Sequence, residues 1–161
     1  MKLGILSAFA VLAWVACKSE PADPAFASPK ATIDTLFTAY DVKTVPQSEI
    51  RRRFTVGERF KLYDHELFKS CFSDWQGEHD EGLGGYVFGK LVAGKDELGI
   101  EVDETVARVR PLSAQEDFPP VVLVKQDAGW KIDLRQSVPA DVRQRLYEVS
   151  RRARRMEQQS R

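Results

Sequence analysis

The sequence predicts an α+β protein in which N-terminal helices pack on a curved antiparallel sheet of about four strands, followed by a C-terminal amphipathic helix. Three observations support this class. The first half of the chain repeats apolar residues at helical spacing, the second half carries β-like and alternating runs, and the C-terminal segment repeats apolar residues along one helical face. Because the helical patterns come first and the strand patterns follow, we expect helices and strands to form separate layers.

The first helix is expected directly after Ser28, a residue suited to cap a helix, with Pro29 at the first helical position. Four apolar side chains then recur at positions i, i+3, i+4 and i+7. This spacing predicts a helix that buries one face. The four residues are Ile33, Leu36, Phe37 and Tyr40.

Two further helices are expected before Gly77. A short helical turn spans about residues 48–54, and its arginines at 51–53 spread around the helix and are expected to be solvated. A longer helix follows with a broad apolar stripe, in which Cys71 is expected to be a buried, unreactive thiol. The stripe consists of Phe60, Tyr63, Leu67, Phe68, Cys71, Phe72 and Trp75.

Strand patterns fill the second half of the chain. Residues 86–93 are β-like, and the glycines around them are expected to shape a loop and a bulged strand start. Residues 98–110 alternate but change phase near Asp103, which predicts a bulge or a short turn. Two more strands lie within residues 119–134. In the last of them Trp130 alternates with polar residues, so we expect its side chain to be buried against a long helix.

Residues 1–16 have the composition of a secretory signal peptide, with one early lysine and then an uncharged apolar run. The run is shorter than the roughly 20 residues that cross a membrane, so cleavage is expected. The small residue before Cys17 resembles the lipobox of bacterial lipoproteins, which implies that Cys17 is lipidated. Residues 17–28 are then expected to form a flexible tether. The alternatives are an ordinary signal peptide that leaves Cys17 as a free thiol, or an uncleaved anchor.

Lipidation of Cys17 implies a place in the bacterial cell envelope, anchored in a membrane and facing the periplasm. Lys18 follows the cysteine where an aspartate would resemble the inner-membrane retention signal, so the outer membrane is favoured. With Cys17 modified, Cys71 is the remaining cysteine, and the fold must be stable without an intramolecular disulfide.

Three segments together resemble the nuclear transport factor 2-like superfamily: the helix beginning SPKATIDTLFTAYD, the aromatic-rich helical segment after it, and the closing strand pair VVLVKQDAGWKIDL. The resemblance covers residues 29–137 and implies a conical α+β domain around an apolar pocket. Relatives use this pocket for catalysis, for ligands or for partners, so the fold does not decide the function. Possible pocket-lining side chains under this resemblance are Tyr40, Tyr63, Phe68, Asp103 and Trp130.

Composition and motifs narrow the function classes. The 24 basic and 24 acidic residues balance, which gives no support for nucleic-acid binding. The sequence has no phosphate-binding loop, nucleophile elbow or catalytic triad pattern, so no catalytic residue and no cofactor are assigned. The acidic, histidine and cysteine residues between Asp64 and Asp80 lack metal-ligand spacing, so no metal is expected.

Residues 138–161 form a basic C-terminal segment beyond the matched domain. Apolar side chains recur along one helical face with arginines on the flanks and back, which predicts an amphipathic helix through about Arg152 with a frayed end. Such a helix can pack on its own domain, dock on a protein partner or lie on anionic headgroups, and we favour packing on the domain. The apolar stripe is Val142, Leu146, Val149, Ala153 and Met156.

These patterns favour a membrane-anchored envelope lipoprotein that acts as a binding or interaction module. The sheet or the C-terminal helix would then carry the surface for a protein partner or for a second copy in a homodimer. The alternative is a pocket enzyme, or a carrier of a small apolar ligand, with the same fold.

Overall fold

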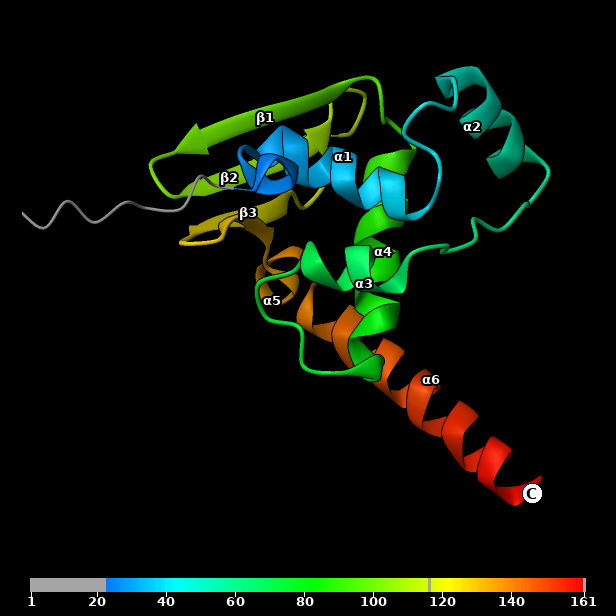
Figure 1. Ribbon diagram of the computed structural model, residues 1–161. Helices are drawn as coiled ribbons and strands as arrows, with labels where there is room; N and C mark the ends of the chain where they lie inside the picture. Colours follow the sequence, from blue (N-terminus) through cyan, green and yellow to red (C-terminus); the bar gives the residue numbers. More distant parts are fainter. Residues whose placement is uncertain (1–22, 116, 161) are drawn as a thin grey trace, which may run out of the picture.

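The computed structural model describes residues 23–115 and 117–160, so Cys17 and the expected signal peptide lie outside the described residues. Helices precede a four-stranded sheet and a long helix ends the chain, which confirms the predicted α+β class (Figure 1). Two short 3-10 turns are labelled η. The elements are η1 (Pro24–Phe26), α1 (Pro29–Ala39), α2 (Gln47–Thr55), α3 (His65–Ser70), η2 (Glu78–Asp80), α4 (Glu81–Val92), β1 (Leu98–Asp103), β2 (Val106–Pro111), β3 (Val121–Gln126), β4 (Gly129–Ile132), α5 (Leu134–Ser137) and α6 (Ala140–Gln159).

The four strands form one antiparallel sheet in the order β1-β2-β3-β4, so each strand pairs with its neighbour in sequence. The predicted phase change after Asp103 is a turn at Glu104 and Thr105, and it divides residues 98–110 into the hairpin of β1 and β2. Glu104 closes this turn with a φ of 48°. The turn into β4 uses Gly129 with a φ of 106°, a conformation that favours glycine.

The core lies between the sheet and helices α1 and α4. Helix α1 packs on β4, and α4 packs on β2 and β3. The Thr32 hydroxyl of α1 donates to the Trp130 carbonyl at 2.8 Å, and Trp130 is 6% exposed, which confirms its predicted burial against a helix. Cys71 is also buried, as predicted, and burial raises the pKa of its thiol to about 12.

Residues 86–93 are not a strand, so that prediction is wrong: nearly all of them belong to α4. Four glycines in α4 lower its helix propensity and gave the segment a pattern typical of loops and bulged strands. Gly84 has a packing reason, because a Cβ at this position would overlap the rings of Phe68 and Phe72. The glycine lets α4 approach these rings, and this packing outweighs the propensity. The sheet still has four strands because residues 98–110 supply two.

The long aromatic helix expected before Gly77 is also wrong in length, since the helical part is α3 alone. The ends of the apolar stripe lie in irregular segments that still contact the core. Phe60 packs against Phe88 with ring centroids 5.6 Å apart, and Trp75 packs against Phe68 at 5.5 Å. Except at Tyr63, which is exposed, the apolar pattern therefore indicates contact with the core and not one continuous helix.

The short helix expected at residues 48–54 is confirmed as α2. Its arginines are solvated as predicted, and Arg52 and Arg53 pair with Glu49 on the helix surface at 2.7 and 3.1 Å. Hydrogen bonds from both arginines lower the pKa of Glu49 to about 2.

The fold begins before the expected end of the tether at residue 28. Phe26 of η1 is 6% exposed, and the Thr35 hydroxyl of α1 donates to the Ala25 carbonyl at 2.9 Å. Lys131 of β4, one of the polar residues that alternate with Trp130, is also buried, with its Nζ 3.0 Å from the centroid of the Phe26 ring. Within the described residues, η1 is therefore part of the folded domain.

Helix α6 packs on the domain through its first half, and its second half projects from it (Figure 1). The helix continues to Gln159, so the predicted frayed end after Arg152 is wrong. Val149 and Met156 are 63% and 70% exposed, so the domain covers only part of the apolar stripe. The side chains of α6 that pack on the core are Val142, Leu146 and Tyr147.

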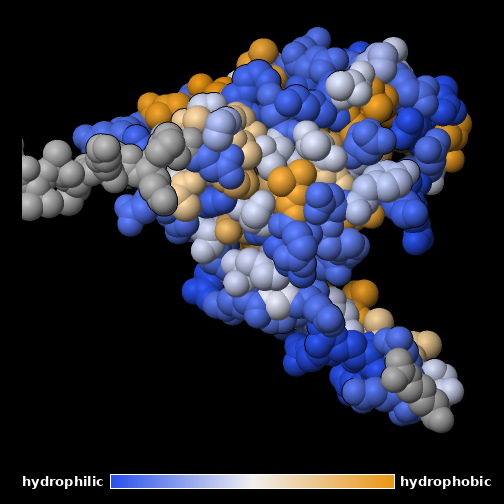
Figure 2. Space-filling view, in the orientation of Figure 1, coloured by the Kyte–Doolittle hydropathy of each residue, from blue (hydrophilic) through white to orange (hydrophobic). Residues whose placement is uncertain are grey.

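The surface of α6 is mostly hydrophilic, with a few hydrophobic atoms near its end (Figure 2). Among the helices in the described part of the chain, none combines the length and the apolar character needed to cross a membrane.

Candidate binding groove

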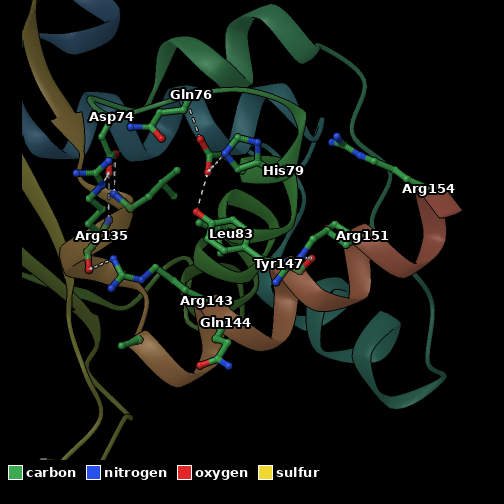
Figure 3. A pocket seen from close by; sticks show the side chains of 14 residues that line it. Asp74, Gln76, His79, Leu83, Arg135, Arg143, Gln144, Tyr147, Arg151 and Arg154 are labelled. Atoms are coloured by element: carbon green, nitrogen blue, oxygen red, sulfur yellow. Dashed lines mark hydrogen bonds and ion pairs between the residues drawn. The ribbon is translucent and has the colours of Figure 1, made fainter.

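A groove of about 760 Å³ lies between α6 and the segment that contains η2 and the start of α4 (Figure 3). Small-molecule sites have volumes of roughly 300–1,000 Å³. Three separate parts of the chain, within residues 74–83, 134–135 and 140–154, form the walls. The lining residues are Asp74, Gln76, His79, Asp80, Leu83, Leu134, Arg135, Ala140, Arg143, Gln144, Tyr147, Ser150, Arg151 and Arg154.

Asp80 is the buried acidic residue of the groove, at 3% exposure. Its Oδ2 accepts a hydrogen bond from the Gln76 backbone N–H at 2.6 Å, and its Oδ1 accepts one from the Tyr147 hydroxyl at 3.2 Å. The second bond ties α6 to the segment before α4. Burial, and then the charge of Asp80, raises the pKa of Tyr147, so this hydroxyl remains protonated and donates at neutral pH.

Asp74 lies on the opposite wall and joins it to the start of α5. Its two oxygens accept the backbone N–H groups of Leu134 and Arg135 at 2.9 and 3.2 Å. The Arg135 guanidinium lies 3.9 Å from the same carboxylate. Both aspartates of the groove therefore already accept hydrogen bonds from within the chain.

Four arginines from α5 and α6 line the groove. Arg143 and Arg151 donate to backbone carbonyls at 3.3 and 3.4 Å, and in the described part of the chain neither forms an ion pair. Arg154 pairs with Glu78 at 3.7 Å, but both side chains are more than half exposed, and such surface pairs contribute little stability. With four arginines against two aspartates, the groove carries positive charge.

This arrangement suits an anionic ligand that also has an apolar part. Guanidinium groups donate in pairs to carboxylates and phosphates, and Leu83 and Leu134 add apolar wall. His79 Nε2 lies 3.6 Å from Asp80 Oδ1, which is beyond hydrogen-bond distance, so the two do not form an aligned acid–base pair. The groove therefore offers charge and shape for binding.

The predicted pocket-lining side chains do not meet at this groove. Tyr40, Phe68 and Trp130 lie in the core, where the Tyr40 ring meets the Phe68 ring edge to face at 5.7 Å. Tyr63 is 63% exposed, and Asp103 is exposed at the end of β1. The structure therefore brings two of the five into contact and leaves two on the surface.

Sequence reasoning missed the groove because its walls are far apart in the chain. Asp80 and Tyr147, which share a hydrogen bond, are 67 positions apart. One signal was present, since Arg143, Tyr147, Arg151 and Arg154 have the spacing of a single helical face. The sequence places these arginines on the flanks and back of the helix, and the structure turns this face toward η2 and α4.

The chain has no match among family models, curated proteins or solved structures. Within the described residues, no group of three or more histidine, cysteine or acidic side chains could hold a metal ion. The functional argument therefore depends on the groove.

Proposed function

We propose that this chain is a lipid-anchored protein of the bacterial cell envelope, and that its α6 groove binds an acidic segment of a partner protein in the periplasm. The positive charge of the groove is the observation that supports this proposal. Four arginines line the groove, while its two aspartates accept hydrogen bonds from the chain itself. An acidic segment would supply carboxylates for these arginines. We include in this proposal the resemblance to the nuclear transport factor 2-like superfamily, because members of that superfamily include binding domains.

The site of the anchor favours a protein partner over the anchoring membrane. Cys17 lies six residues before Asp23, and six fully extended residues span about 20 Å. A lipid on Cys17 would therefore keep the η1 end of the domain near the membrane. The C-terminal end of α6 lies at the opposite end of the molecule (Figure 1). We infer that α6 points away from the membrane.

A titration with two synthetic peptides tests the proposal. One peptide alternates glutamate and leucine, and the other carries glutamine at every glutamate position. We expect the glutamate peptide to bind at least about tenfold more tightly, because it alone can pair with the arginines. Combining Arg143→Gln with Arg151→Gln is expected to remove most of this difference.

The matched control combines Arg152→Gln with Arg155→Gln, two exposed arginines of α6 that do not line the groove. Both double variants lose the same charge, so a general electrostatic attraction would affect them equally. Equal loss of binding in the two double variants, or equal binding of the two peptides, would show that the groove is not the site.

A further inference from the structure

A second pocket, separate from the α6 groove, lies where the end of α4 meets the loop between β2 and β3. Its volume is about 540 Å³, within the roughly 300–1,000 Å³ of small-molecule sites. Most of its wall is apolar or aromatic and includes Tyr86, Ala93, Pro111 and Phe118. Among the described lining residues, Lys90 alone carries a charge.

The Lys90 ammonium group lies at the wall of this pocket, and the residue is 9% exposed. Its Nζ is 5.6 Å from the centroid of the Tyr86 ring and 4.9 Å from that of Phe118. It donates to the carbonyls of Pro119 and Ser137, at 2.5 and 3.5 Å. An ammonium group has three N–H donors, so one remains for another acceptor.

Most buried charged side chains are paired with an opposite charge, and Lys90 differs from them. The described residues provide no ion pair for it, and burial lowers its pKa. Two carbonyls and two aromatic rings stabilise the ammonium group in part. A ligand carboxylate in the pocket would add the countercharge, and the apolar wall would bury the rest of that ligand.

We propose that this pocket binds a small apolar carboxylate, with the carboxylate at Lys90 and the hydrocarbon part against Tyr86 and Phe118. The site is independent of the proposed function of the α6 groove, because the two share no lining residue. Gly89 also lines the pocket, and a Cβ added there meets nothing within 4 Å. A Cβ at Gly89 therefore has free space at the wall of the pocket, and a larger side chain there is expected to occupy part of the pocket.

Calorimetric titration with octanoate tests this proposal, with 1-octanol as the neutral analogue and octylamine as the cationic one. We expect octanoate to bind at least about tenfold more tightly than either analogue. Gly89→Leu is expected to weaken octanoate binding at least about tenfold, while the control Gly89→Ala changes it less than about twofold. Lys90→Met keeps the apolar stem and is expected to remove the preference for octanoate over octanol.

Three results overturn the proposal: no saturable binding of octanoate, equal affinity for octanoate and octanol, or unchanged octanoate binding by the Gly89→Leu variant. The pair of Gly89 variants decides the result if Lys90→Met fails to fold, because Gly89 is exposed and has free space around it. A negative result with octanoate does not affect the peptide titration of the α6 groove, so the two experiments test the two proposals independently.

Discussion

Tyr40 lies in the aromatic centre of the core, stacked on Phe88 with the ring centroids 3.6 Å apart. Burial, and then the charge of Glu81, raises the pKa of its hydroxyl to about 12. In the unfolded chain a tyrosine ionises near pH 10. The stability that depends on neutral Tyr40 is therefore complete below about pH 10 and is lost as the pH rises toward 12.

The Tyr40→Phe variant cannot ionise at this position, so it should lose less stability than the wild type at alkaline pH. Relative to their difference at pH 7, we expect the variant to gain about 1 kcal/mol over the wild type at pH 11. Urea unfolding at the two pH values measures this difference. Tyr63→Phe is the control, because it removes the same hydroxyl group from a side chain that is 63% exposed.

At the scale of one element, α4 contains two glycines with opposite expected effects. Gly84→Ala places a methyl group against the rings of Phe68 and Phe72, and overpacking of this kind costs about 1–3 kcal/mol. Gly89→Ala meets open space on the exposed face, and alanine is the better helix former by about 0.5–1 kcal/mol. Thermal unfolding should show a lower midpoint for the first variant and a higher one for the second. A higher midpoint for both would mean that α4 does not approach these rings.

Helix α6 consists of a packed half and a projecting half. Two shortened chains test how much each half contributes to stability. A chain that ends at Ser150 loses no buried side chain among residues 151–160, so its unfolding free energy should change by less than about 0.5 kcal/mol. A chain that ends at Pro139 also loses the contacts of Leu146 and Tyr147 with the core, and should be less stable by about 2–4 kcal/mol. An equal loss in the two chains, measured by urea unfolding, would contradict this division.

How far the sequence predicts each element depends on whether its determinants are local. The caps of α1 and the alternation of β4 lie within those elements, so both are predictable. The helical state of α4 is not, because the reason for Gly84 is the ring of Phe68 in another element. The α6 groove has the same difficulty, since the bond between Asp80 and Tyr147 closes it across 67 positions. The helical spacing of the α6 arginines shows one wall of the groove, but no local pattern shows which part of the chain this wall faces.

At the scale of the whole molecule, charge is balanced overall and uneven locally. The chain carries 24 basic and 24 acidic residues, yet α6 holds six arginines and three acidic residues. Because its net charge is balanced, the whole protein has no general attraction for anions. Its binding of anions should therefore depend on the arginines of α6.

The proposed anchor makes a prediction for the whole chain in cells. A doubly acylated cysteine holds a protein on a membrane firmly, while one acyl chain gives marginal binding. We expect the wild type in the membrane fraction, and Cys17→Ser either in the soluble fraction or as an unprocessed precursor. Fractionation with immunoblotting distinguishes these outcomes, and Cys71→Ser controls for the loss of a thiol. A correctly cleaved Cys17→Ser protein that stays on the membrane would rule out lipid anchoring.

The central claim, that the α6 groove binds an acidic partner segment, is tested most directly by mapping where the glutamate peptide contacts the protein. Backbone amide chemical shifts recorded during a peptide titration provide this map. We predict that the shifted resonances cluster in residues 74–83 and 140–154, the two longer parts of the groove wall. Shifts confined to the sheet, or scattered over the surface while these two segments stay unchanged, would contradict the claim.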